Sequence, residues 1–130
     1  NREPRTALTV TVKMGESGPL LQFTSTHLDQ GRELGNRVAQ ANELNERLVT
    51  RNGQPTILAG DFNEKDDSAL NPLRSMGLVE TSHGPTYPSW NPSLKLDRIF
   101  VTSDVKIVNV NIINDPLLSD HCAITFEIKI

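Results

Sequence analysis

The residues of this 130-residue chain that could carry chemistry are acidic and amide side chains next to predicted strands. Asp61 and Asn63 stand two apart just after a short apolar segment, and residues two apart in an extended backbone point to the same side. Asp120 adds a carboxylate just before the last apolar segment. Oxygen ligands of this kind suit a hard divalent ion such as Mg2+ or Mn2+. The pattern therefore predicts a metal site formed by Asp61, Asn63 and Asp120.

Two histidines accompany these oxygen ligands. His27 and His121 can each donate or accept a proton near neutral pH. We expect Asp97 to orient and charge-stabilise one of the two imidazole rings. A divalent cation, a histidine and an orienting carboxylate together fit hydrolysis of a phosphate ester, in which a base activates water and an acid assists the leaving group. The sequence therefore predicts a phosphoesterase.

Segments of alternating or continuous apolar residues predict the strands that must hold these side chains. The first covers residues 6–14, where apolar and polar residues alternate with the period of a half-buried strand. His27 and Asp61 follow the ends of two later strands, whereas Asp97 and Asp120 stand at the starts of two others. Since the end of one strand lies beside the start of its antiparallel neighbour, we expect these residues to gather on one rim of a sheet. The later strands are predicted over residues 20–26, 56–60, 97–102, 105–113 and 122–130.

Two helices and one long loop complete the predicted architecture. Apolar residues recur three and four apart over residues 32–51, which predicts a helix with one buried face that stops at Asn52-Gly53. A shorter helix is expected over residues 68–76. Residues 81–95 form a long irregular loop, of a length that usually serves a function. The chain is thus predicted to be a mixed α/β sandwich.

Four short motifs occur in the order and rough spacing of a known group of enzymes. They are THLD at residues 26–29, GDFN at 60–63, LDRIF at 96–100 and SDH at 119–121. In these motifs the chain resembles the endonuclease/exonuclease/phosphatase superfamily, the DNase I-like group of metal-dependent phosphoesterases. A TYPSW stretch at residues 86–90, and Arg37 with the Gln40-Ala41 pair that follows it, also resemble bacterial members. The likeness extends over about residues 20–130.

The resemblance implies a fold and a set of catalytic residues. The fold would be an α/β (α+β) four-layer αββα sandwich of the DNase I-like type, with the active site at one rim of two packed sheets. Asp61 and Asn63 would position water, metal and phosphate, and Asp120 would be linked to the metal. His121, hydrogen-bonded to Asp97, would contact the scissile phosphate. Which residue activates water stays open, as does the substrate, because members cleave nucleic acids as nucleases, sphingomyelin or inositol phosphates.

Four further residues have two interpretations each. His27 resembles the second histidine of the phosphodiesterase branch, a general acid or phosphate ligand, but a structural histidine is the alternative. Arg37 is a candidate for substrate binding, although a charge on a helix is most simply solvent-facing. Tyr87 and Trp90 are candidates to line the substrate cleft, and packing of their loop against the body explains them equally well.

One departure from the family concerns its early motifs. An asparagine in the first strand and a metal-binding glutamate after the following helix have no counterpart here. We therefore interpret residues 1–130 as the C-terminal part of a single domain, whose N-terminal half is missing. We expect this fragment alone to be inactive, because a metal ligand is lacking. An apolar sheet face without its cover would also favour self-association.

Composition excludes several classes of protein. A net charge of −3 argues against a strongly basic nucleic-acid binder. No apolar run approaches the roughly 18 residues that span a bilayer, so no membrane span is expected. A single cysteine excludes an intramolecular disulfide and does not indicate a cellular compartment. The alternative function is a non-catalytic binding module that keeps the fold, which loss of Asp61, Asn63, Asp97 or His121 would favour; none is lost.

Overall fold

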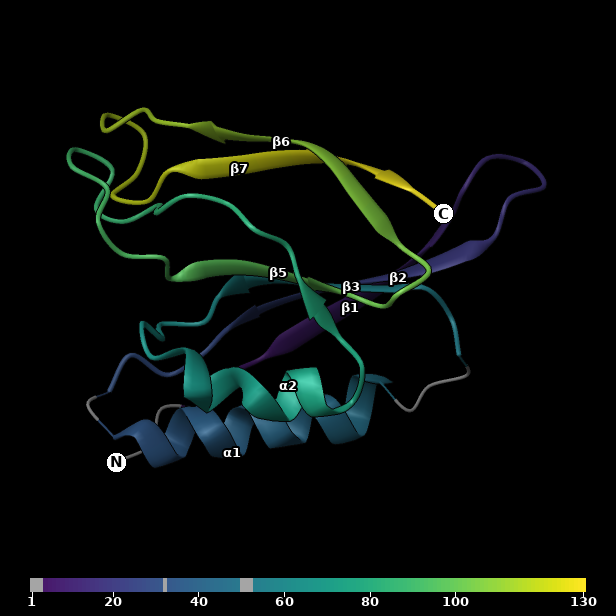
Figure 1. The fold of residues 1–130 in the computed structure, drawn as a ribbon, viewed down its shortest axis with the longest axis horizontal. Helices are drawn as coiled ribbons and strands as arrows, with labels where there is room; N and C mark the ends of the chain where they lie inside the picture. The colour runs from purple at the N-terminus through teal and green to yellow at the C-terminus, as the bar shows by residue number, and fades with distance from the viewer. Residues whose placement is uncertain (1–3, 32, 50–52) are drawn as a thin grey trace.

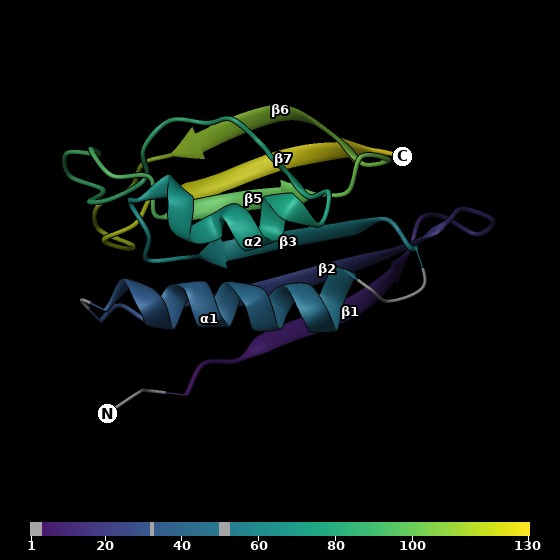
Figure 2. The same ribbon diagram turned by 60° about the horizontal axis from the view of Figure 1, so that its bottom comes forward.

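The computed structural model describes residues 4–31, 33–49 and 53–130. These residues form a layer of helices, a five-stranded sheet and a two-stranded sheet, stacked in that order (Figures 1 and 2). The chain is therefore a mixed α/β protein, as predicted. Its elements are, in chain order, β1 (Ala7–Lys13), β2 (Leu20–His27), α1 (Leu34–Leu44), η1 (Asn45–Val49), β3 (Thr56–Asp61), η2 (Asp67–Leu70), α2 (Asn71–Ser75), β4 (Val79–Glu80), β5 (Asp97–Val101), β6 (Lys106–Ile113) and β7 (Ala123–Lys129).

The five-stranded sheet has the order β1-β2-β3-β5-β4. β1 and β2 form an antiparallel hairpin, β2 and β3 run parallel, and β5 is antiparallel to its neighbours β3 and β4. A parallel pair requires a crossover connection, which α1 supplies between β2 and β3. As a result the C-terminal ends of β2 and β3 lie at one edge of the sheet, beside the start of β5.

The helices cover one face of this sheet (Figure 2). Ala41 and Leu44 of α1 are buried there, because the spacing of three places both on one side of the helix. Phe62 and Phe100 meet edge to face beneath the helices, with ring centroids 5.4 Å apart. A buried side chain of this size contributes roughly 1.5–3 kcal/mol to the free energy of unfolding. This first core contains Leu28, Ala41, Leu44, Leu58, Phe62, Leu70, Leu73, Leu78 and Phe100.

The opposite face of the sheet packs against the antiparallel pair β6–β7. Ile124, Phe126 and Ile128 alternate along β7 and point toward the larger sheet, as the period of two requires. Ile57 of β3 and Ile99 of β5 meet them from below. This second core, between the two sheets, sets the spacing between β5 and the loop that precedes β7.

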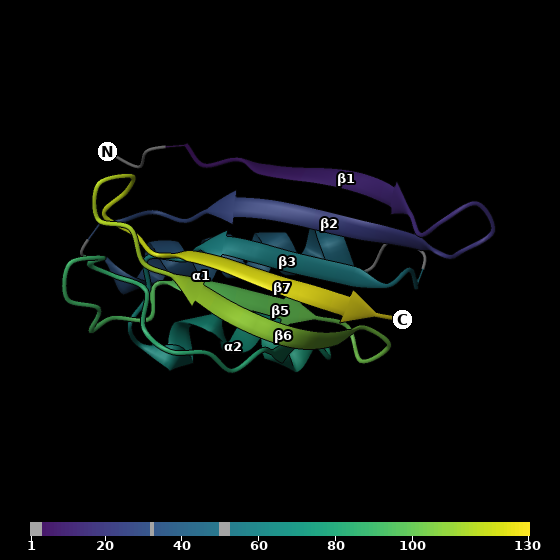
Figure 3. The ribbon, with the colours of Figure 1, turned by 90° about the horizontal axis from the view of Figure 1, so that it is seen from above.

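The second sheet is too narrow to cover the first completely. Seen from above, β6 and β7 lie over β3 and β5, whereas β1 lies to one side without cover (Figure 3). Leu8, Val10 and Val12 of β1 are consequently 66%, 48% and 42% exposed. Val12 pairs with Leu21, a member of the second core, so the exposed row continues the same apolar face.

The predicted elements differ from the observed ones mainly at their ends. The helix predicted over residues 32–51 is α1 followed by a wider turn, η1. Of its predicted stop at Asn52-Gly53, Asn52 lies outside the described residues, and Gly53 lies beyond η1 with a positive φ of 61°. The helix predicted over residues 68–76 begins as a tighter turn, η2, at whose start the side chain of Asp66 accepts from the N–H of Ser68. The two-residue strand β4 was not predicted, since it carries no period of its own. Within the described ranges, no helix is long and apolar enough to cross a membrane.

Candidate active site

The polar residues of the motifs meet at one end of the two sheets. The strand register places His27 beside Asp61, and Asp61 beside Asp97, across three neighbouring strands. The loop that leads into β7 closes over the same end and brings Asp120 and His121 to it (Figure 3). A cavity of about 650 Å3 lies between these segments. Its lining includes Ser25, Thr26, His27, Gln30, Gly60, Asp61, Asn63, Tyr87, Leu96, Asp97, Asp120 and His121.

Backbone conformation fixes the loop that follows β3. Gly60 has φ +151°, and a Cβ there would lie only 1.9 Å from the carbonyl oxygen of Thr26, so only glycine fits before Asp61. Asn63 also has a positive φ, of 48°, which asparagine tolerates better than most residues. Its N–H donates to Asp61 Oδ1 at 2.8 Å, and its Nδ2 donates to the carbonyl of Leu28 at 2.9 Å. The amide oxygen is therefore the atom that Asn63 can offer to a cation.

His121 is held by a carboxylate. Its Nδ1 lies 2.7 Å from Asp97 Oδ2, and because the carboxylate accepts, Nδ1 carries the proton. The hydroxyl of Thr86 donates to the same oxygen of Asp97 at 2.5 Å. The ring of Tyr87 lies against the imidazole, with centroids 4.8 Å apart. These contacts direct the other ring nitrogen, Nε2, toward Asp61, whose Oδ2 is 3.6 Å away.

The charges of this cluster influence one another. Burial lowers the pKa of His121, but the hydrogen bond to Asp97 and the negative charges of Asp97, Asp61 and Asp120 outweigh that effect, so its pKa lies above the usual value. Burial raises the pKa of Asp61 and outweighs the hydrogen bond from the N–H of Asn63, which lowers it. The nearby charge of Asp97 raises this pKa further. The site thus favours a protonated imidazole facing a carboxylate that binds a proton more readily than usual.

The other candidates from the sequence fall into two groups. His27 lies at the mouth of the cavity, with Nε2 3.5 Å from Asp61 Oδ2, and Tyr87 lines the cavity. Arg37 does not reach the cavity: its side chain is buried, and Nε donates to Glu64 at 2.6 Å. Trp90 is exposed and does not line it either. The structure therefore does not bring Arg37 or Trp90 to the site.

Sequence reasoning missed the residues that hold the site from the long loop. Thr86 and Ser89 are fully buried. Ser89 donates its N–H to the carbonyl of Asp120 and its hydroxyl to that of Ser119, both at 2.7 Å, which secures the segment before His121. Both residues belong to the TYPSW stretch, so the signal was present. Nothing in the sequence marks the two hydroxyl groups as buried, because serine and threonine are mostly exposed.

The donor set fits a hard divalent cation. Asp61, Asp97 and His121 each offer one ligand atom, and these atoms lie within 4.8 Å of one another. Asp97 is already engaged by His121 and Thr86, which leaves Asp61 as the central carboxylate. Asn63 and Asp120 add oxygen atoms at the same cavity. Carboxylate and amide oxygens are the ligands that Mg2+ and Mn2+ favour.

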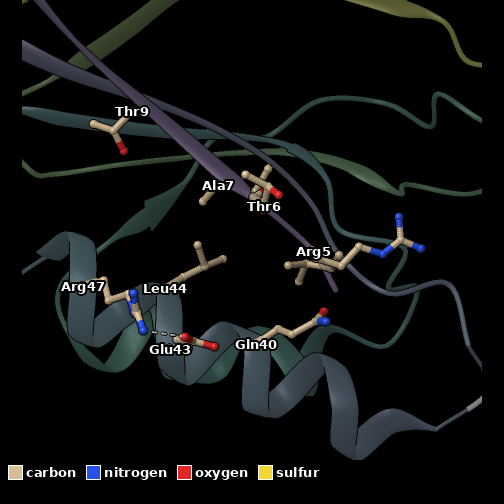
Figure 4. Close-up of a pocket in the computed structure, with 10 residues that line it drawn as sticks. Arg5, Thr6, Ala7, Thr9, Gln40, Glu43, Leu44 and Arg47 are labelled. Atoms are coloured by element: carbon tan, nitrogen blue, oxygen red, sulfur yellow. Dashed lines mark hydrogen bonds and ion pairs between the residues drawn. The ribbon is translucent and has the colours of Figure 1, made fainter. Parts of the chain in front are cut away.

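A second cavity, of about 430 Å3, lies between β1 and α1 (Figure 4). Side chains of β1 and of the residues just before it line one side, among them Thr6, and side chains of α1 such as Gln40 line the other. Arg47 at its rim pairs with Glu43 at 3.0 Å. The described lining contains neither a histidine nor an aspartate. This cavity therefore does not bring together the groups needed for the predicted chemistry.

The motifs, the layered fold and the convergent carboxylates and histidines define a DNase I-like domain. Residues 4–121 match the model of the Endonuclease/Exonuclease/phosphatase family, and the chain belongs to that family. No curated protein sequence matches the chain.

Solved structures with the same fold come from distant organisms. A mannosyl-6-phosphatase of Bacteroides thetaiotaomicron superposes with a TM-score of 0.81 at 22% identity over 98% of this chain. The human Nocturnin catalytic domain with bound sulfate gives 0.71 at 24% identity over 95% of this chain. D. rerio TDP2 complexed with single strand DNA product gives 0.72 at 21% identity over 95%. The chain spans only 58%, 53% and 62% of these three chains, respectively.

Proposed function

We propose that the protein is a phosphoesterase that depends on Mg2+ or Mn2+ and hydrolyses a phosphodiester or phosphomonoester bond. The observation that carries this proposal is the setting of His121, with one ring nitrogen held by Asp97 at 2.7 Å and the other facing Asp61 at 3.6 Å. Family membership supports the hydrolase class. One similar structure is a mannosyl-6-phosphatase and another is bound to a DNA product, so the fold serves phosphate chemistry on different substrates.

Each residue of the cavity has a role in this proposal. Asp61, Asn63 and Asp120 would hold the cation, which when bound neutralises phosphate charge and polarises the scissile bond. His121, kept protonated by its carboxylate neighbours, donates from Nε2 to a phosphate oxygen, and Asp97 fixes the ring. His27, at the mouth, is the second phosphate ligand or the acid for the leaving group. Because His121 is protonated in this proposal, Asp61 is the group placed to take a proton from the attacking water.

We also propose that residues 1–130 are the C-terminal part of one domain. The chain spans 53–62% of three similar structures, and β1 presents an uncovered apolar row. The N-terminal part of the domain would cover this row and supply a further metal ligand. Without it, the exposed face of the fragment would favour self-association. Experiments on activity therefore use the full-length protein that contains these residues.

The test measures hydrolysis of a chromogenic phosphodiester and a chromogenic phosphomonoester by the full-length protein. We expect activity with Mg2+ or Mn2+, loss on chelation and recovery when metal is returned. His121→Ala should lower kcat by at least 10²-fold, the scale of a positioned electrostatic or acid–base group. His83→Ala is the matched control. His83 does not line the cavity, and its Nδ1 forms a hydrogen bond with the carbonyl of Gly84.

Two results would contradict the proposal. Activity of His121→Ala within threefold of the wild type would remove this histidine from the site. A folded full-length protein that hydrolyses neither ester with either metal would instead favour the non-catalytic binding module.

A further inference from the structure

Glu64, the residue directly after the GDFN motif, is 2% exposed although it carries a carboxyl group. Both carboxylate oxygens are engaged. Arg37 of α1 donates from Nε to Oε2 at 2.6 Å, and the N–H of Asp66 donates to Oε1 at 2.7 Å. The side chain of Glu64 therefore connects the loop after β3 to the helical layer and to the next turn.

The backbone of Glu64 is held as well as its side chain. Arg98, which follows Asp97 in β5, donates from Nη2 to the carbonyl oxygen of Glu64 at 2.9 Å. Its side chain is only 4% exposed, and Nη1 donates to Asp67 and Glu80. Arg37 and Arg98 therefore hold Glu64 from two sides. These three residues are here called the Glu64 cluster.

Stability alone is a weak explanation for the Glu64 cluster. Removing two charges from water costs more than their attraction commonly returns, so a buried ion pair is often no more stabilising than apolar residues of the same volume. The cluster lies directly behind a strained segment, since Asn63 has φ +48°. A conformation of this kind persists only where its surroundings hold it.

We propose that Glu64 is a positioning residue, which with Arg37 and Arg98 holds Asp61 and Asn63 in the geometry that the cavity requires. On one side of the Asp61–Asn63 segment, Asn63 hydrogen-bonds to Leu28. On the other side, Glu64 hydrogen-bonds to α1 and β5. This role also accounts for Arg37, which the structure keeps away from the cavity. The effect on metal and catalysis rests on the proposed function, whereas the effect on the loop does not.

The first variant is Glu64→Gln in the full-length protein. Two donors, Arg37 Nε and the N–H of Asp66, face the two carboxylate oxygens. An amide has a single oxygen, so its NH2 group must face one of these donors whichever way it turns. We expect faster hydrogen exchange over residues 61–66, a 10- to 100-fold weaker affinity for Mn2+, and a kcat lower by about 10²-fold with KM within threefold.

Two further variants keep the outcome decisive. Glu43→Gln removes the carboxylate of an exposed pair with Arg47 and should leave all three readouts unchanged. Arg37→Met combined with Glu64→Leu replaces the buried pair with apolar groups of similar size. This double variant should fold even if Glu64→Gln fails to fold. This double variant should melt close to the wild type and still show faster exchange over residues 61–66.

The readouts separate the two proposals. Mn2+ affinity is measured by electron paramagnetic resonance, and exchange by mass spectrometry of the metal-free protein. If a folded double variant exchanges over residues 61–66 as slowly as the wild type, the positioning role is overturned. If the wild type neither binds Mn2+ nor hydrolyses an ester, the proposed function fails, and the exchange measurement still decides the role of Glu64.

Discussion

Replacing Asp97 and His121, singly and together, tests whether the two side chains act as one unit. Asp97 Oδ2 accepts from His121 Nδ1 at 2.7 Å, and Asp97→Asn keeps the shape of the side chain while removing its charge. The variant retains a carbonyl oxygen but no longer stabilises a protonated imidazole. We therefore expect the His121 ring to be held less firmly in its orientation and its pKa to fall, while the fold is retained.

The expected magnitude follows from the nature of this hydrogen bond. A hydrogen bond to a charged group contributes about 1.5–3 kcal/mol net, and each 1.36 kcal/mol changes a rate tenfold. Asp97→Asn should therefore lower kcat by about 10- to 150-fold. His121→Ala should lower it by at least 10²-fold, because it removes the group through which Asp97 acts. The double variant should lie within about threefold of His121→Ala alone.

The assay is kcat and kcat/KM on a chromogenic phosphodiester at saturating Mg2+, with the melting temperature of each variant measured beside it. Asp104→Asn is the matched control, since Asp104 also accepts from a threonine hydroxyl, that of Thr102 at 2.6 Å, and does not line the cavity. A loss in the double variant equal to the product of the two single losses would refute the pairing. The two residues would then contribute independently.

Three other predictions concern the surroundings of the site. Thr86→Val removes the hydroxyl that donates to Asp97 at 2.5 Å and should lower kcat by about 2- to 10-fold, with no change expected for Thr102→Val. Burial raises the pKa of Glu80, but hydrogen bonds from Lys95 and Arg98 lower it below its usual value, so its stabilisation is present above about pH 4.5 and is lost as the pH falls. Thermal melts from pH 7 to pH 3 should therefore decline less steeply for Glu80→Gln, and an equally steep decline would contradict this assignment. Residues 1–130 expressed alone should show no Mg2+-dependent hydrolysis and should associate in light scattering; a monomer with the full-length rate would contradict the proposal that a further part of the domain is needed.

The sequence alone determined which residues have the chemistry and on which elements they lie. Alternation along β7 and the spacing of Ala41 and Leu44 predicted a strand and a helix, because a side chain's face follows directly from the period of its backbone. The positions of Asp61 and Asp97 at opposite ends of their strands predicted that both lie at one rim, since antiparallel neighbours bring an end beside a start. These features depend on local geometry, which residue order fixes.

Only the tertiary structure decided which of these groups touch. The 2.7 Å contact of Asp97 with His121 joins the start of β5 to the loop before β7. The spacing of these two segments depends on how the second core packs between the two sheets. Arg37 was predicted either to bind substrate or to face solvent, yet it is buried against Glu64, because its place on α1 faces the loop after β3. Glu64 itself carried no signal, since a glutamate after a turn is usually exposed. Burial and pairing depend on segments distant along the chain, and no local period encodes them.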